Sequence, residues 1–313
     1  MVKLGLRRIA LSVPIAAVVA TLTFFLVELV PGDPAAFLLG TGATAQQVTE
    51  LHRAMGLDRP VVVQYGSWLG HALQGDLGMS LVSNQSVSAT LGQALPVTVS
   101  VATLATLFTV VAGVMLGIVA AVRGGVLDSA VQWVGSISMS IPSFWLAAVL
   151  VLAVAIKLPW LPATGYVTVS TSPSLWASHL VLPMIAVGLA GVGPVAFQTR
   201  AAVLDQLSRE YVRTLVAAGL PARRILFKHV LRNASGPVVT VVSLGFVFAL
   251  GGVVIIESIF NLPGMGTLML KSVRSHDLPL VQGAVLFFSL LVVAVNLLAD
   301  LVVAALNPRV RIG

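Results

Sequence analysis

Long apolar runs constrain this chain more than any other feature of its sequence. Six such runs are present, at about residues 9–30, 97–122, 132–156, 179–199, 237–258 and 281–306. Each is close to the roughly 20 residues with which a helix crosses a hydrocarbon core of about 30 Å. Only 9% of the residues are charged, against about 25% in soluble domains. We therefore expect an all-α, polytopic membrane protein with six transmembrane helices.

The first apolar run begins like a secretory signal, because Lys3, Arg7 and Arg8 precede it. The uncharged stretch from Ile9 to Val27 is longer than the usual core of a signal peptide. No pattern of small residues typical of a cleavage site follows this stretch. We interpret the run as a retained membrane anchor.

The loops between the runs differ in positive charge. With the N-terminus inside, 13 of the 18 basic residues lie in the cytoplasm. The others, Arg53, Arg59, Lys157, Lys271 and Arg274, lie outside. Because cytoplasmic loops carry an excess of Lys and Arg, this distribution predicts that both termini are cytoplasmic. The orientation in the membrane then accounts for the net charge of +7. The chain has no continuous basic tract, so we predict no nucleic-acid partner.

The polar segments divide the chain unevenly. Residues 31–96 are too polar to span a membrane, and we expect an extracytoplasmic segment with short helical pieces. We therefore predict one unit at 1–96, formed by the first helix and this segment. A second unit, 97–313, holds the other five helices and a large cytoplasmic loop at about 200–236.

The sequence lacks the motifs of the commonest self-contained chemistries. It contains no phosphate-binding loop, no His-Glu-x-x-His zinc helix and no Gly-x-Ser-x-Gly nucleophile turn. It has no cysteine, and its five histidines are scattered without metal-ligand spacing. We therefore predict no catalytic residue, no metal site and no cofactor bound by this chain.

The large cytoplasmic loop contains the stretch EYVRTLVAAGLPARRILFKHVLRN, residues 210–233. Val212, Leu215, Val216 and Gly219 fall at helical spacing on one face, which predicts a short amphipathic helix that ends at the glycine. A second helix begins near Pro221 and carries several basic residues: Arg224, Lys228 and Arg232. From the residues alone, two interpretations are equally good: an interfacial helix on anionic membrane lipid, or a docking site for a cytoplasmic partner.

The whole chain resembles the permeases of binding-protein-dependent ABC importers, in the dipeptide, oligopeptide and nickel branch. The resemblance includes YVRTLVAAGLPARRILFKHVLRNASGPVVT in the cytoplasmic loop. Further matching motifs occur in the expected order: VPGDPA, GLDRPVVVQYGSWL, GDLGMSL, SIPSFWLA, FNLPGMGTL, LPLVQG and NPRVR. Two departures concern Arg213-Thr214-Leu215, where the wider family has Glu-Ala-Ala, and Asn307, where Asp commonly precedes Pro-Arg.

The resemblance implies a type I ABC importer (MetI-like) permease fold in a bacterial inner membrane. It also implies partners: a second homologous permease, two cytoplasmic ATPase subunits or one fused ATPase, and an extracytoplasmic substrate-binding protein. ATP and Mg would be bound by the ATPases. The resemblance also implies an ATPase-coupling loop whose short coupling helix, Val212 to Gly219, sits in a groove of the ATPase. The residues of this loop would be Glu210, Tyr211, Val212, Arg213, Thr214, Leu215, Val216, Ala217, Ala218, Gly219 and Leu220.

The residues of a translocation path are harder to select from the sequence. Candidates are Ser136, Ser138, Ser140, Ser143, Glu257 and Asn261. The serines could line a polar path, or they could let helices approach closely, as we expect for Gly113 and Gly117. Glu257 and Asn261 could line an outer mouth or cap a helix.

We carry three interpretations of function forward. The first is the B-type permease of a peptide importer. The second keeps the fold and changes the cargo to nickel or glutathione. The third is a self-contained channel or membrane enzyme, which the missing catalytic motifs disfavour.

Overall fold

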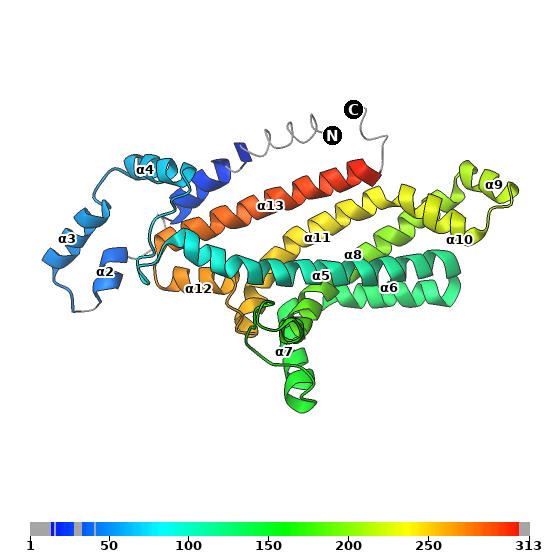
Figure 1. Cartoon of the computed structure of the whole chain (residues 1–313), viewed down its shortest axis with the longest axis horizontal. Helices are drawn as coiled ribbons and strands as arrows, with labels where there is room; N and C mark the ends of the chain where they lie inside the picture. Colours follow the sequence, from blue (N-terminus) through cyan, green and yellow to red (C-terminus); the bar gives the residue numbers. More distant parts are fainter. Residues whose placement is uncertain (1–13, 16, 28–32, 41, 307–313) are drawn as a thin grey trace. The chain divides into compact units, whose positions relative to one another are not determined.

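The computed structural model describes residues 14–15, 17–27, 33–40 and 42–306 (Figure 1). In these ranges the chain is helical apart from its loops and one isolated bridge between Met79 and Ser86. The all-α prediction is therefore confirmed. The charged N-terminus and the departure at Asn307 lie outside the described residues.

Among the described residues, four helical segments are long and apolar enough to cross a membrane. They are α5 (Val87–Arg123), α8 (Pro173–Ser208), the segment Ala222–Ile259, and Leu278–Ala299 within α13 (Leu278–Leu306). The segment Ala222–Ile259 comprises α10 (Ala222–Arg224), the π-helical turn η2 (Ile225–Val230) and α11 (Leu231–Ile259). The shorter apolar helix Ala17–Val27 lies within the first predicted span, whose remaining residues are only partly described.

The third predicted span is broken rather than straight. Helix α6 (Gly125–Ser140) and the segment Ser143–Lys157, made of α7 (Ser143–Leu150) and η1 (Val151–Lys157), bend by 95° relative to each other. Ile141 takes an extended conformation, as residues before proline do, and Pro142 has no N–H with which to continue the helix. Pro142 therefore breaks the third predicted span. Counted as one span, the bent pair is the fifth apolar crossing in the described chain.

Two compact units are present, one centred on Thr98–Leu262 and one formed by Arg8–Val97 with Pro263–Val293. In the first unit, α8 packs against α5 and α6 through small residues. A Cβ added to Gly117 would lie 2.5 Å from the carbonyl oxygen of Ala196, and one added to Gly193 would lie 2.4 Å from that of Gly135. Gly113 is similarly crowded by Val195, at 2.8 Å. The predicted packing role of Gly113 and Gly117 is confirmed.

The second unit contains the expected short helical pieces, α2 (Pro34–Leu39), α3 (Ala45–Met55), α4 (Val61–Leu73) and α12 (Met265–Arg274). Its core is apolar and consists mainly of Leu77, Val87, Leu91, Met265, Leu280 and Ala284. Buried Asp277 accepts hydrogen bonds from the hydroxyl of Ser80, at 2.5 Å, and from the amide of Leu81, at 3.2 Å. The sequence-based boundary at residue 96 stays a prediction.

Candidate functional site: a surface helix and a membrane cavity

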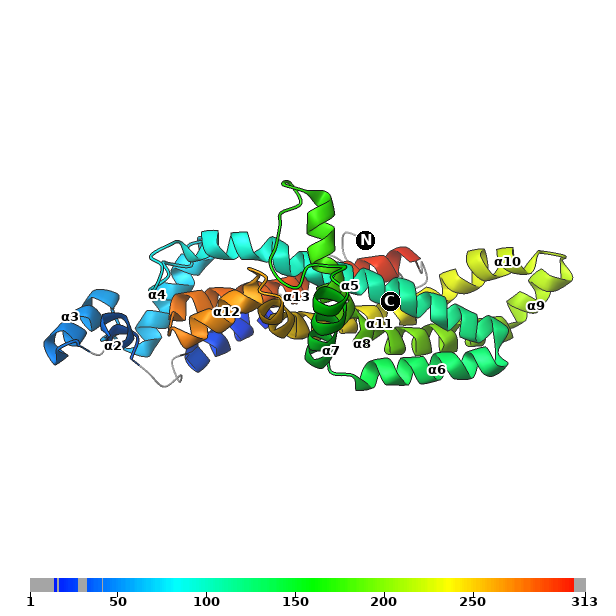
Figure 2. The ribbon, with the colours of Figure 1, turned by 90° about the horizontal axis from the view of Figure 1, so that it is seen from below.

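The short helix predicted in the cytoplasmic loop is present as α9 (Glu210–Ala217). Arg209 separates it from α8 with an extended backbone, and the Arg209 guanidinium binds the carboxylate of Asp205 at 3.0 Å. Glu210 occupies the first turn of α9, where a negative charge complements the helix dipole. Within the first unit, α9 lies at the ends of α8 and α10 in both ribbon views (Figure 2).

A glycine closes the C-terminus of α9. Gly219 has φ +77°, which is a left-handed conformation, and its amide donates to the carbonyl of Val216 at 2.9 Å. The amide of Leu220 donates to the carbonyl of Leu215 at 3.2 Å. These two bonds form a Schellman motif, which usually requires glycine at this position. Among the described residues, no atom lies within 4 Å of a Cβ added to Gly219. The left-handed backbone, and not crowding by neighbouring atoms, is therefore what favours glycine here.

One side of α9 is buried in its own unit. Val212 joins a buried cluster with Val203, Ile225, Val230 and Ala234. Tyr211, Leu215 and Leu220 pack against this cluster. The prediction that Val216 and Gly219 share the face of Val212 is wrong, because Val216 is 60% exposed and Gly219 is also exposed. The closing turn brings Leu220 to the cluster, so the buried side uses Leu220 in addition to Leu215.

The outward side of this region is apolar at its tip and basic next to it. The exposed residues of α9 and its closing turn include Arg213, Thr214, Val216, Ala217, Ala218 and Gly219. Four exposed basic residues follow, Arg223, Arg224, Lys228 and Arg232. Within the described chain, none of these four pairs with a carboxylate. The arrangement leaves both the small tip and the cations available to a partner.

An ion pair that the sequence did not reveal joins α6 to α8. The Arg200 guanidinium donates to both carboxylate oxygens of Asp128, from Nε to Oδ1 and from Nη2 to Oδ2, each at 2.5 Å. Such two-point pairing fixes the relative orientation of the two side chains. The two residues are far apart in the sequence. From the sequence alone, Arg200 counted only as one of the 13 basic residues on the cytoplasmic side.

A cavity of about 370 Å³ lies in the first unit between α5, α7, α8 and α11. Thr106, Thr109 and Ser143 are the hydroxyl-bearing residues of its lining, and none of the described residues that line it is charged. Thr109 already donates its hydroxyl to the carbonyl of Gly188 at 2.6 Å. The cavity is therefore lined mainly by apolar residues.

The structure separates the six candidate path residues. Only Ser143 lines the cavity. Ser138 is buried between helices, where its hydroxyl donates to the carbonyl of Gly135 and accepts from the amide of Gly193. Ser140 donates to the carbonyl of Ser136, and both are exposed. Sequence reasoning missed Thr106 and Thr109, although their spacing on one helix was visible.

The two remaining candidates lie at the end of α11. Glu257 is fully buried and accepts a hydrogen bond from the hydroxyl of Thr98 at 2.5 Å. Its backbone carbonyl accepts from the amide of Leu262 at 2.8 Å. Asn261 is exposed and has φ +49°, in the turn that follows the helix. Neither residue lines the 370 Å³ cavity.

Several apolar spans, a cavity between them and an exposed helix between two spans define the class as a multi-pass membrane protein. Residues 113–312 match the family described as binding-protein-dependent transport system inner membrane component, and residues 1–102 match the N-terminal region of such components. The chain belongs to this family and is an ABC importer permease.

Known proteins are similar in sequence to this chain over almost its full length. A protein of Brucella abortus named as a peptide transport system permease is 40% identical over 312 residues, covering 99% of each chain. A peptide ABC transporter permease of Sinorhizobium fredii and a glutathione transport system permease of Salmonella typhi are each 36% identical, covering 98% of each chain. The fold is similar to that in a solved inward-facing MetNI methionine ABC transporter, with TM-score 0.53 and 16% identity over 69% of this chain and 96% of the other.

Proposed function

We propose that this chain is the B-type permease subunit of an importer for di- and oligopeptides. The observation that carries this proposal is the 40% identity, over 99% of both chains, to a permease named for peptide transport. The chain would form the translocation path with a second, homologous permease. Two cytoplasmic ATPase subunits, or one fused ATPase, and an extracytoplasmic substrate-binding protein would complete the transporter.

The proposed orientation has both termini in the cytoplasm. The distribution of Lys and Arg supports it, because 13 of 18 basic residues then lie inside. In this orientation α9 and the exposed cations that follow it face the cytoplasmic ATPases. The second unit, with α2, α3 and α4, faces the substrate-binding protein.

The energy for transport would come from the partners. ATP and Mg would be bound by the ATPases, while this chain would bind no cofactor and catalyse no covalent step. Closure of the ATPases would push α9, which one extended residue joins to the end of α8. Because α8 packs closely on α5 and α6, a shift of α8 would move the walls of the 370 Å³ cavity and alternate its access.

Glutathione is the second candidate cargo. The Salmonella relative named for glutathione transport is 36% identical over 98% of both chains. Glutathione is itself a short peptide with free charged ends, so both cargoes need similar chemistry.

Purification of the transporter through a tag on this chain tests the proposal. The complex should contain a second permease and an ATPase, and in proteoliposomes it should accumulate labelled leucyl-leucine or glutathione only when ATP is present. Competition between the two would rank the cargoes. Uptake that continues after the ATPases are removed would instead indicate a channel and would overturn the proposal.

A further inference from the structure

The second compact unit holds a cavity of its own, of about 440 Å³. Its lining comes from Ala17–Val27, the end of α3, the loop from α3 to α4, α4 itself, the loop after α4 and the start of α13. The rings of Phe24 and Trp68, which both line it, have centroids 5.6 Å apart. The volume and the largely apolar lining are those of a site for a small molecule, which needs only a few polar groups to orient it.

Gln282 gives this cavity an unused hydrogen-bonding group. The residue lines the cavity from α13 and is only 6% exposed. Its side-chain amide makes no hydrogen bond within the described part of the chain. The amide nitrogen and oxygen of Gln282 are not among the described side-chain atoms that are both fully enclosed and without a partner, so the amide stays accessible from the cavity. A ligand in the cavity could satisfy this amide.

Two opposite charges line the same cavity without pairing. The Arg59 guanidinium and the Asp76 carboxylate do not come within 4.0 Å of each other, and neither forms another ion pair in the described chain. Asp76 uses Oδ1 to accept from the amide of Gly78 at 2.9 Å. Both residues are exposed at the surface, and their charges, more than 4.0 Å apart, are open to a ligand that carries one charge of each sign.

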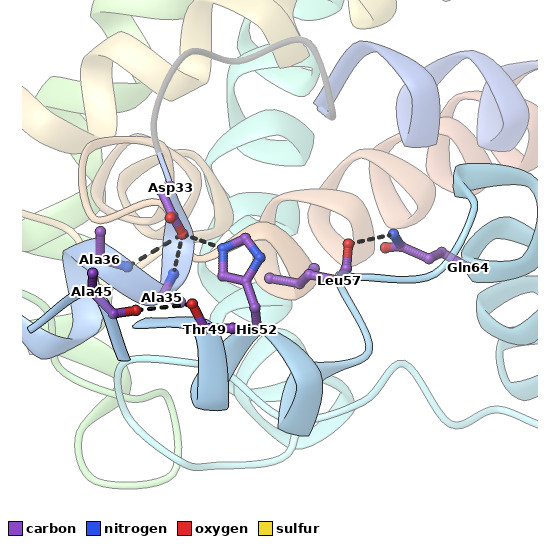
Figure 3. Close-up of polar contacts among 8 residues, drawn as sticks. All are labelled: Asp33, Ala35, Ala36, Ala45, Thr49, His52, Leu57 and Gln64. Carbon is purple, nitrogen blue, oxygen red and sulfur yellow. Dashed lines mark hydrogen bonds and ion pairs between the residues drawn. The ribbon is translucent and has the colours of Figure 1, made fainter. Parts of the chain in front are cut away.

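The loop that carries Arg59 is held in place by neighbouring contacts. The side-chain amide of Gln64 donates to the carbonyls of Arg59, at 3.0 Å, and Leu57, at 3.3 Å; the second of these bonds is drawn in Figure 3. On α4, Nδ1 of His71 lies 2.7 Å from the carbonyl of Ser67, which can only accept. His71 lines the cavity too, and this bond fixes its ring. These contacts order the backbone of the loop and the ring of His71, whereas the Arg59 guanidinium itself stays free to meet a ligand.

We propose that this cavity binds a small zwitterion of the amino acid or short-peptide class. Its carboxylate is placed at Arg59, its ammonium group at Asp76 and a further polar group at Gln282. An apolar side chain of the ligand packs against Phe24 and Leu77. This inference deepens the proposed function. It rests on that function only in choosing peptides as the ligands to test.

The first test uses the full chain in lipid nanodiscs, without the ATPases or the binding protein. Calorimetric titration compares leucyl-leucine, free leucine, and leucyl-leucine with an acetylated N-terminus, an amidated C-terminus or both. The free dipeptide should bind, and each cap should weaken binding by about tenfold, because it removes one charged contact. Tighter binding of leucine would assign the site to amino acids. Equal affinity for free and doubly capped dipeptide would overturn the proposal.

Variants then locate the binding site. Arg59→Gln should weaken leucyl-leucine binding by about tenfold or more, and Gln282→Leu by about threefold to tenfold. The matched controls, Arg53→Gln and Gln46→Leu, alter exposed residues of the same unit that do not line the cavity. They should bind as the wild type does. If folded Arg59→Gln and Gln282→Leu proteins bind leucyl-leucine as tightly as the wild type, the cavity is not the binding site. If Gln282→Leu does not fold, the capped peptides decide whether the wild-type site binds a zwitterion.

Transport assays separate this proposal from the proposed function. If Arg59→Gln lowers both nanodisc binding and ATP-driven uptake, the cavity belongs to the transport cycle. If the wild-type complex shows no peptide uptake while the nanodiscs still bind leucyl-leucine, the peptide-importer proposal fails and the zwitterion site stands. Absence of binding by wild-type nanodiscs, with normal uptake, removes the site alone.

Discussion

Asp128 and Arg200 join α6 to α8 through two parallel hydrogen bonds of 2.5 Å. Both side chains are only partly exposed, at 17% and 30%. Helix α8 leads into α9, and α6 leads through Pro142 into α7, whose Ser143 lines the membrane cavity. The pair therefore connects the helix next to the proposed coupling site with the helix next to the cavity.

We predict that this pair transmits movement as well as stabilising the fold. Asp128→Arg and Arg200→Asp should each lower the amount of substrate carried per ATP hydrolysed, because α6 can then lag behind α8. The combined exchange should recover part of this ratio. The ratio of uptake to ATP hydrolysis in proteoliposomes is the measurement, with Arg123→Asp, at the exposed end of α5, as the control. Equal ratios in all variants, with only the melting temperature changed, would limit the pair to a structural role.

The topology can be tested with single cysteines, since the natural chain has none. Ser83 and Ser208 are both exposed, in the second and first units respectively. A membrane-impermeant thiol reagent should label Ser83→Cys only from the outside and Ser208→Cys only from the inside, as the positive-inside rule predicts. Labelling of both cysteines from the same side would contradict the proposed orientation.

The spans could be predicted because each helix satisfies its own backbone and reveals itself as a long apolar run. The ending of α9 could be predicted because Gly219 is a local signal for a left-handed turn. The Asp128–Arg200 pair and the Gly135–Gly193 contact could not, because each joins residues distant in the sequence. The exposure of Val216 was missed because periodicity over two turns does not define which edge of a helix packs.

Asp277 should stabilise the second unit through its buried carboxylate. Replacing it with alanine leaves the hydroxyl of Ser80 and the amide of Leu81 without their acceptor. We expect a loss of about 2 kcal/mol or more in the free energy of unfolding. Thermal or denaturant unfolding in detergent would measure the loss. Asp277→Asn, which retains one oxygen, should be milder, and exposed Asp58→Ala should have little effect; similar effects for all three would refute the argument.

Acid should weaken the contact between α2 and α3 (Figure 3). Asp33 binds Nε2 of His52 at 2.7 Å, and this bond, with those from the amides of Ala35 and Ala36, lowers the pKa of Asp33 below its usual 3.8. A lowered carboxylate pKa means that the stabilisation is present above the unfolded-state value and is lost as pH falls through the folded-state value.

His52→Ala should therefore make the α2–α3 segment lose structure at a higher pH than in the wild type. The readout is pepsin cleavage within residues 33–55, compared between proteins at each pH so that the pH dependence of pepsin itself cancels. Thr49→Val is the control, because Thr49 donates only to the carbonyl of Ala45 and does not touch Asp33. Identical cleavage profiles for His52→Ala and the wild type would exclude a role for the His52 contact.

Gly219 combines a backbone requirement with a proposed docking role, and two substitutions separate them. Gly219→Ala adds only a methyl group but must hold φ +77°, which costs about 1–2 kcal/mol. Gly219→Asn tolerates this conformation better but adds a longer side chain to the exposed tip. No atom of the described residues lies within 4 Å of a Cβ at this position, so we expect obstruction of a longer side chain to come from a partner.

If α9 enters a close-fitting groove of the ATPase, Gly219→Asn and the bulkier Gly219→Leu should assemble poorly with it or fail to couple. Substrate-stimulated ATP hydrolysis and uptake should then fall together, whereas membrane insertion and capture of the binding protein persist. A helix that only rests on lipid predicts the opposite for Gly219→Leu, because an added apolar side chain strengthens interfacial binding. Stimulated ATPase activity of the reconstituted complex decides between them: wild-type activity and uptake in an assembled Gly219→Leu complex would exclude α9 as the coupling helix.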